Sequence, residues 1–125
     1  MQQQGARAYQ QMARQTVNPR DLEADLLSKS ASRFQRIRDD WNAANGDLFG
    51  ALQFNRRLWN VFLNSVTRDD SPLPLDVRQN VANLGLFVLK HSLAVQIEPA
   101  ARRLDILINI NREVAAGLRA SAPNQ

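Results

Sequence analysis

The chain alternates long stretches of helical periodicity with short polar breaks. Apolar residues recur at the three- and four-residue spacing of one helix face in four stretches, about 19–42, 48–66, 74–97 and 99–119. No stretch keeps the two-residue alternation that predicts a strand. Because the connections are short, neighbouring helices are expected to run antiparallel. We therefore predict an all-α fold, a compact antiparallel helical bundle of four to five helices.

Prolines mark three of the predicted helix starts. Pro19, Pro74 and Pro99 each suit the first helical position, where the missing N–H would have no partner in any case. The first start has two further signals, because Asn18 is a good capping residue and Asp21 would meet the positive end of the helix dipole.

Two polar segments separate the predicted helices. The first, NAANGD at 42–47, contains Asn45-Gly46, which is suited to a left-handed turn, and Asp47, which is suited to cap the next helix. The second, TRDDSPLPLD at 67–76, combines a serine, paired acids and two prolines, and it is the clearest loop.

The periodicity also predicts which side chains are buried. The first helix is expected to bury one stripe and to carry surface ion pairs on the opposite side, Asp25 with Lys29 and Arg36 with Asp40. The predicted stripes are Leu22, Leu26, Ser30, Phe34, Ile37 and Trp41; Leu48, Leu52, Asn55, Trp59, Phe62 and Val66; Val77, Val81, Leu84, Val88, His91 and Val95; and Leu104, Leu107, Asn111, Val114 and Leu118.

The stretch RQNVANLGLFV at 78–88 departs from simple helix-forming composition. Asn80, Asn83 and Gly85 are unfavourable inside a helix, glycine by about 1 kcal/mol relative to alanine. Something other than local preference must favour them, and the missing side chain of Gly85 would let another backbone approach closely.

Length and charge indicate one domain with a basic leading segment. At 125 residues, residues 18–120 are expected to form a single bundle domain and residues 121–125 a disordered tail. We predict that residues 1–17 form a basic polar arm, because residues 1–20 carry Arg7, Arg14 and Arg20 and no acidic residue. This arm is predicted to be either mobile or a docking helix through Ala6, Tyr9, Met12 and Ala13.

Composition restricts the compartment and the redox chemistry. The chain has no cysteine, which excludes disulfides and thiolate metal sites. The polar N-terminus lacks a signal-peptide pattern, and the longest apolar run, 79–89, is too short to cross a bilayer. We expect a cytoplasmic protein without membrane insertion. Fourteen arginines against two lysines fit a binding surface, although we favour a simple compositional bias.

The residues that could carry catalysis do not form a recognisable motif. His91 is the only histidine and falls on the stripe of the third helix, so we interpret it as a residue that lines the bundle. The three glutamates form no Glu-x-x-His pair, and no glycine-rich phosphate motif is present. We expect no enzyme activity, no cofactor and no metal.

Nucleic-acid binding is possible but not favoured. Arg33, Arg36 and Arg38 cluster on one helix, and a patch of this kind is enough for phosphate contacts. Asp39 and Asp40 follow directly, however, and the aromatic residues occupy core-facing stripes. We interpret this face as solvated and ion-paired.

Amides recur on three successive helices and leave two readings open. They are Asn55, Asn60, Asn64, Asn80, Asn83, Asn109 and Asn111. Buried amides can bond between helices and fix their register. Alternatively, some of them line a groove and orient a partner's helix, while apolar anchors supply the affinity.

Four segments carry a resemblance to a known family. They are NPRDLEADLLSKSASRF, FNRRLW, SPLPLDVRQNVANLGLFV and LININREVAAGL, and together they span Asn18 to Leu118. With them the chain resembles the FlaF family of flagellar biosynthesis regulators, and Ala8-Tyr9-Gln10 is similar to that family's opening. The resemblance implies a helical cytoplasmic protein that supports flagellin production and export together with FlbT, without catalysis.

From this resemblance we expect a flagellin-binding export chaperone, because flagellin's ends form amphipathic helices that a bundle groove could cover. The alternative is a post-transcriptional regulator of flagellin mRNA translation that acts through FlbT or by direct RNA contact. The candidate partner-binding residues are Asn55, Arg56, Trp59, Asn80, Asn83, Asn109 and Arg112. The sequence leaves the oligomeric state and the position of the groove open.

Overall fold

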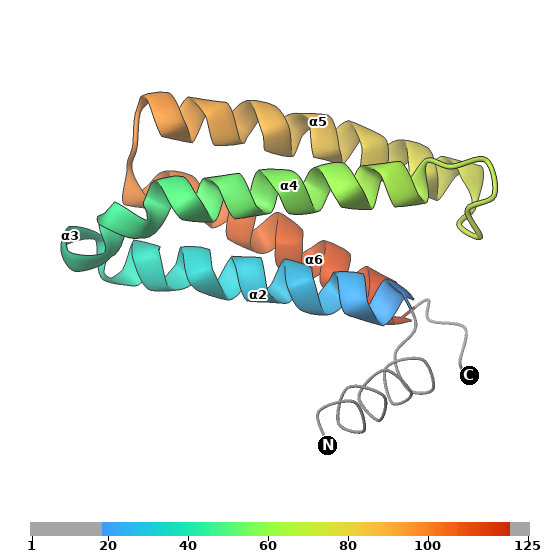
Figure 1. The fold of residues 1–125 in the computed structure, drawn as a ribbon, viewed down its shortest axis with the longest axis horizontal. Coiled ribbons are helices and arrows are strands. Elements are labelled where there is room, and N and C mark those ends of the chain that lie inside the picture. The colour runs from blue at the N-terminus through green and yellow to red at the C-terminus, as the bar shows by residue number, and fades with distance from the viewer. Residues whose placement is uncertain (1–18, 121–125) are drawn as a thin grey trace, which may run out of the picture.

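Four long helices and three short ones make up the computed structural model, which describes residues 19–120 (Figure 1). The long helices are α2 (Pro19–Asp39), α4 (Leu48–Val66), α5 (Leu75–Ile97) and α6 (Asp105–Ala120). The short elements are α3 (Trp41–Ala44) and the 3₁₀ helices η1 (Asn45–Asp47) and η2 (Ala101–Leu104). The predicted arm 1–17 and tail 121–125 lie outside the described residues.

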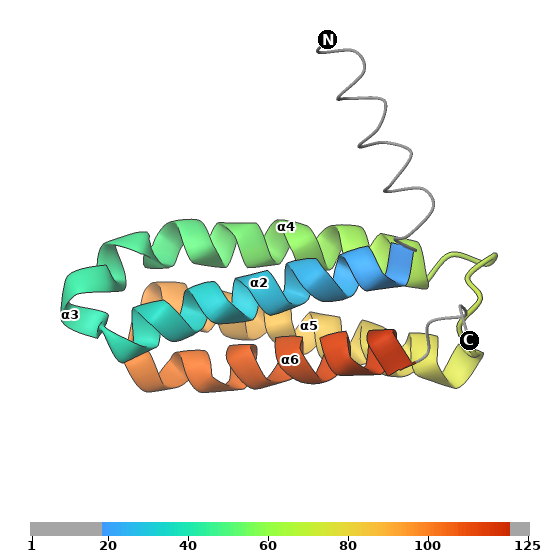
Figure 2. The same cartoon turned by 90° about the horizontal axis from the view of Figure 1, so that it is seen from below.

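Successive long helices run antiparallel, which confirms the predicted bundle (Figures 1 and 2). α2 packs most closely on α6, and α4 contacts both α2 and α5. In Figure 1 α5 and α2 lie at opposite edges of the bundle with α4 and α6 between them, and in Figure 2 α4 and α6 form the opposite edges, so α2 and α5 occupy diagonal positions. α5 is therefore attached to the bundle mainly through α4.

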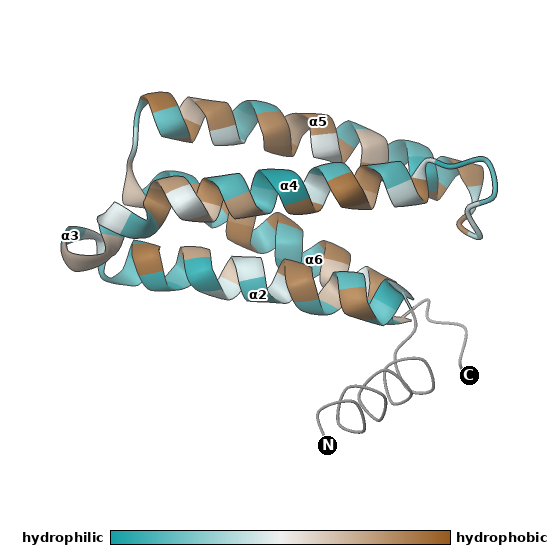
Figure 3. Cartoon of the chain, viewed as in Figure 1, coloured by the Kyte–Doolittle hydropathy of each residue, from teal (hydrophilic) through white to brown (hydrophobic). Residues whose placement is uncertain are grey.

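The core draws most of its large side chains from α2, α4 and α6. Trp59 and Phe62 meet edge to face near its centre, with ring centroids 5.4 Å apart. The other large side chains with almost no exposure are Leu27, Phe34, Ile37, Leu52, Val66, Val88, Val95, Leu104, Leu107 and Ile108. α5 buries only Gly85, Val88, Ser92 and Val95. Apolar residues occur along the whole length of α5 in Figure 3. Leu75, Leu86 and Leu93 are each more than half exposed, so α5 is apolar on more than one face.

The predicted stripe of α2 is wrong at its N-terminal end. Leu22 is 52% exposed, whereas Ala24 and Leu27 are fully buried. The reason is that α2 packs on both α4 and α6, so its buried surface is centred between two neighbours. Trp41 is half-buried in α3, after α2 has ended.

Of the two ion pairs predicted along α2, one is replaced by a pair between helices and the other does not form. Asp25 accepts a hydrogen bond from Arg119 of α6 at 2.9 Å, not from Lys29. Asp40 lies beyond α2 at the N-cap of α3, and it forms no ion pair with Arg36 among the described residues. A helix-surface acid pairs with a neighbouring helix when that helix brings a guanidinium within reach.

The helix starts follow the prolines only in part. Pro19 begins α2 as predicted, whereas Pro74 is the N-cap of α5, which begins at Leu75. After Pro99 the chain first forms η2, and α6 begins at Asp105. Proline sets its own φ, but it does not oblige the residues after it to adopt α rather than 3₁₀ geometry.

The connection before α4 contains no left-handed turn, contrary to the prediction. Asn45 and Gly46 belong to η1, and the described glycines all have negative φ. Asp47 is the N-cap of α4, but its carboxylate binds Arg33 of α2 at 2.6 and 2.8 Å instead of capping the helix. The hydrogen bond from Arg33 lowers the pKa of Asp47, and this exposed pair ties the start of α4 to α2.

The packing of α5 on α4 explains the glycine in the third predicted helix. A Cβ added at Gly85 would lie 2.6 Å and 2.7 Å from the two methyl carbons of Leu63. The prediction was that another backbone approaches Gly85 closely. The close neighbour is instead the Leu63 side chain of α4. Gly85 therefore lets Leu63 pack directly against the α5 main chain.

Gly85→Ala should lower the free energy of unfolding by about 1 kcal/mol, because the clash with Leu63 outweighs the gain in helix propensity. In a Leu63→Ala background the same change should instead raise stability by about 1 kcal/mol, since the space is then open. Urea unfolding of the four proteins, followed by circular dichroism, measures both steps. A loss of stability in both backgrounds would contradict this account of Gly85.

Candidate functional site

The structure distributes the seven candidate partner-binding residues over three environments. Asn55 and Trp59 are fully buried inside the bundle. Asn80, Asn83, Asn109 and Arg112 are exposed, the first two on α5 and the other two on α6. Arg56 is half-buried on α4 and donates to Gln96 Oε1 of α5 at 3.4 Å. These seven residues do not form a single site.

The buried candidates belong to a hydrogen-bonded network that joins three helices. Asn55 Oδ1 of α4 accepts two hydrogen bonds of 2.8 Å, one from Ser30 Oγ of α2 and one from Asn111 Nδ2 of α6. Trp59 Nε1 of α4 donates to Asn111 Oδ1 at 2.9 Å. Ser30, Asn55 and Asn111 are each at most 1% exposed. We call Ser30, Asn55, Trp59 and Asn111 the core amide network.

The indole sets the direction of every bond in this network. Trp59 Nε1 is only a donor, so the atom of Asn111 that faces it must be the oxygen. The nitrogen of Asn111 then faces Asn55, which must present its own oxygen to both Asn111 and Ser30. Asn55 Nδ2 is left buried without a hydrogen-bond partner in the described part of the chain, at a cost in stability.

The network revises the role of two candidates. Asn55 and Trp59 were expected to line a groove, but a polar atom of each forms a hydrogen bond with Asn111 within the core. Their amide and indole groups fix the register of α2, α4 and α6. For Asn55 and Asn111 the structure thus supports the core reading of the amides, and Asn80, Asn83 and Asn109 remain candidates for partner contact.

An apolar cleft opens where α4 ends and α5 begins. It measures about 400 Å³, and we call it the terminal cleft. Its lining comes from α4, the α4–α5 loop, α5 and α6, and consists of Phe62, Leu73, Pro74, Val77, Val81, Val114, Gly117 and Leu118. No charged residue lines it. The helical period predicted Val77, Val81 and Val114 in buried stripes and gave no role to Gly117.

The terminal cleft arises because α5 and α6 do not close on each other at this end. Val77 is 38% exposed and Val81 is half-buried. On α6 Gly117 leaves space in the cleft that a larger side chain would fill, since a Cβ added there would meet no described atom within 4 Å. This glycine was the sequence signal for the cleft, but its meaning depends on which helix faces it.

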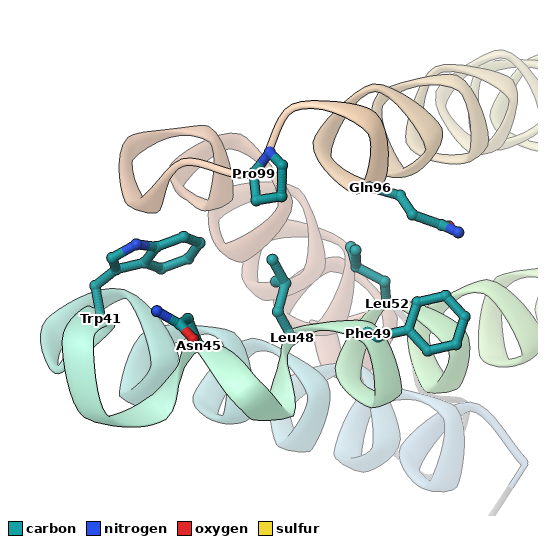
Figure 4. A pocket seen from close by; sticks show the side chains of 7 residues that line it. All are labelled: Trp41, Asn45, Leu48, Phe49, Leu52, Gln96 and Pro99. Atoms are coloured by element: carbon teal, nitrogen blue, oxygen red, sulfur yellow. The ribbon is translucent and has the colours of Figure 1, made fainter.

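A second hollow of about 330 Å³ lies at the opposite end of α5, between α4 and the α5–α6 connection (Figure 4). Its lining consists of Trp41, Asn45, Leu48, Phe49, Leu52, Gln96 and Pro99. In Figure 4 the indole of Trp41 and the ring of Pro99 border the same opening. Phe49 is 52% exposed at this hollow, and Gln96 links it to the candidate residue Arg56.

The histidine and several of the arginines have structural partners. His91 is half-buried, its Nε2 lies 2.8 Å from the carbonyl oxygen of Arg103, and its ring stacks on Phe87. Arg33 binds Asp47, and Arg38 binds Asp39 and Asp105. Arg112 donates to Gln35 of α2. Most of the arginine face is thus engaged within the bundle.

One basic hollow persists between α2 and α4. It measures about 430 Å³ and is lined by Lys29, Ser32, Arg33, Arg36 and Phe54. Among residues 19–120 there is no group of three or more His, Asp or Glu side chains placed to hold a metal ion. None of the helices in this range is both long and apolar enough to cross a bilayer.

A four-helix bundle with apolar hollows at two ends of one helix is a fold suited to binding side chains of another polypeptide. The model of one family, described as Flagellar protein FlaF, matches residues 5–118. The chain therefore belongs to the FlaF family, as its four motifs predicted. Neither the curated proteins nor the solved structures contain a significant match.

Asn111→Ala should lower the free energy of unfolding by about 3 kcal/mol, because it leaves the Trp59 N–H buried without an acceptor and opens a cavity. Asn109→Ala is the matched control on the same helix, and at this exposed position the change should stay within about 0.5 kcal/mol. Denaturant unfolding of both variants tests the network, and equal effects would argue against it.

Proposed function

We propose that the protein is a flagellin-binding export chaperone that supports the synthesis and secretion of flagellin. Membership of the FlaF family makes it a flagellar protein, and this supports a role in flagellum biogenesis. The observation that carries the chaperone proposal is the terminal cleft, an accessible hollow lined by apolar side chains from α4, α5 and α6. It acts by binding in the cytoplasm before export, and it needs no catalysis, cofactor or metal.

The cleft has the chemistry that an amphipathic helix recognises. Apolar side chains of such a helix insert between helices and leave water, each fully buried side chain gaining about 1.5–3 kcal/mol. The cleft walls offer Val77 and Val81 on one side and Val114 and Gly117 on the other. The amphipathic helices expected at the ends of flagellin provide matching residues at intervals of three and four.

Exposed amides near the cleft supply polar contacts. Asn80 lies on α5 between Val77 and Val81, and Asn83 follows one turn later. Asn109 lies two helical turns before Gly117 on α6. In our proposal Asn80 and Asn109 hydrogen-bond the guest helix and orient it, while the apolar walls supply the affinity.

The other candidates act elsewhere. Asn55 and Trp59 maintain the bundle that forms the cleft. Arg56 donates a hydrogen bond to Gln96, which lines the second hollow. At that position Arg56 would contact a longer guest. Arg112 is held on the α2 side of α6, so its contribution to binding is expected to be the smallest.

The alternative function is post-transcriptional regulation of flagellin mRNA through an FlbT-type regulator or by direct RNA contact. The observation that favours it is the basic hollow, where Lys29, Arg33 and Arg36 surround Phe54. Phosphate binding at such a site weakens steeply as salt rises, whereas apolar insertion into the terminal cleft does not.

Gly117→Leu should lower the affinity for flagellin about tenfold or more, because the added side chain occupies the space that a guest side chain needs. A Cβ at this position would meet no described atom within 4 Å, so the bundle should tolerate the change. Isothermal titration with purified flagellin measures the loss. Ala116→Leu, one residue earlier and exposed, is the matched control and should bind normally.

The same titration at two salt concentrations separates the two functions. Chaperone binding should change little between them. If the protein retains only the flagellin mRNA leader, and only at low salt, the chaperone proposal fails. Loss of flagellin binding in both leucine variants would point away from the terminal cleft.

A further inference from the structure

The outward side of α5 carries a second apolar surface that the terminal cleft does not use. Leu75, Leu86 and Leu93 are 69%, 60% and 51% exposed. They belong to a row that recurs at alternating four- and three-residue steps, Leu75, Gln79, Ala82, Leu86, Leu89, Leu93 and Gln96. We call this the α5 outer row. It lies on the opposite side of the helix from Val77, Val81, Val88 and Val95.

The spacing of this row is that of a helix-pairing seam. Leu75, Ala82 and Leu89 are seven residues apart, and so are Gln79, Leu86 and Leu93. A repeat of this kind keeps a straight contact line along a partner helix. α5 packs on the bundle through α4, and no other described helix covers the outer row. A seam of this length calls for another helix.

The residues beside the seam are complementary to those of a second copy. One flank is closed, because Gly85 and Ser92 are buried on the α4 side. The open flank carries Asp76, Asn83 and Lys90, again seven residues apart. In an antiparallel pair Asp76 of each copy faces Lys90 of the other, which gives two equivalent contacts. Asn83 faces its own equivalent near the twofold axis. In a parallel pair the open flank of one helix would instead face the flank of Gly85 and Ser92, which is buried on the α4 side, so the contacts between Asp76 and Lys90 would not form.

The same arrangement matches the apolar layers. Leu75 would meet Leu93 of the second copy, Gln79 would meet Leu89, and the small Ala82 would meet the larger Leu86. At the two layers beside the axis a small side chain then faces a larger one, as close packing favours. Lys90 is exposed and forms no ion pair with any described residue, so its charge is available for this contact.

We propose that the protein forms a homodimer in which α5 pairs antiparallel with α5 of a second copy, across a twofold axis near Asn83. The interface uses the outer row and leaves the terminal cleft open, because the cleft residues Val77 and Val81 lie on the other side of α5. A single helix pair about 35 Å long is a modest interface, and its dissociation constant is expected on the order of micromolar.

Sedimentation equilibrium of the full chain at low ionic strength should show dimers at concentrations of about 100 μM. Leu86→Glu should raise the dissociation constant at least ~100-fold, because each interface then buries two carboxylates in place of two leucines. Leu22→Glu is the matched control, since Leu22 is a similarly exposed leucine on α2, and it should dimerise normally. A chain that is monomeric throughout this range overturns the proposal.

Charge reversal distinguishes the antiparallel arrangement. Asp76→Lys and Lys90→Asp should each weaken dimerisation about tenfold, since each replaces two attractive contacts by two repulsive ones. The double variant Asp76→Lys with Lys90→Asp should restore the original affinity. Circular dichroism confirms that these exposed changes leave the fold intact. A double variant as weak as the single ones overturns the antiparallel pairing.

Cross-linking locates the axis, because the chain has no cysteine of its own. Asn83→Cys should oxidise readily to a disulfide-linked dimer, whereas Leu93→Cys alone should not, since its neighbour across the interface is Leu75. Efficient cross-linking of Leu93→Cys alone would indicate a parallel pair. Flagellin capture that is lost in Leu86→Glu but retained in Gly117→Leu would assign the outer row to flagellin instead, and would overturn the dimer.

Discussion

The indole N–H of Trp59 is the constraint on which the arrangement of three helices depends. It can only donate, so it fixes the orientation of Asn111, and Asn111 in turn fixes the orientation of Asn55. Asn55 accepts one hydrogen bond from Asn111 and a second from Ser30. These bonds lie in a low-dielectric core, where an unmade hydrogen bond is costly. A shift of α2 or α6 by one turn would break them. The polar network therefore selects one register among the several that apolar packing alone would tolerate.

α5 is held in the bundle by a different interaction, and much of its surface is not packed against another helix. It contributes no residue to the core amide network, and its most intimate contact is the approach of Leu63 to Gly85. Close packing against one neighbour leaves the rest of its surface uncommitted. The helix is consequently apolar on two sides, one facing the terminal cleft and one facing outward. Both proposed partners, the flagellin helix and a second copy, meet the protein on this helix.

The two proposals fit together geometrically. Pairing of α5 helices in opposite directions places the two terminal clefts toward opposite ends of the dimer. Each cleft remains accessible, because the twofold axis passes near Asn83 and the cleft begins at Val77 and Val81. A FlaF-family dimer of this kind would present two independent apolar sites. The amides Asn80 and Asn83, which are poor helix formers, then have separate uses, one beside the guest and one at the axis.

The sequence by itself determined the four helices and the start at Pro19, because the helical period and proline geometry are local properties. Its four motifs also determined the family. Only the tertiary structure decided that Asn55 is buried and Asn80 exposed, although the two amides are chemically identical. It also brought Asp25 to Arg119, 94 residues away, and left Leu22 in solvent. Periodicity shows which residues share a face, but burial and bonding depend on which other helix packs against that face.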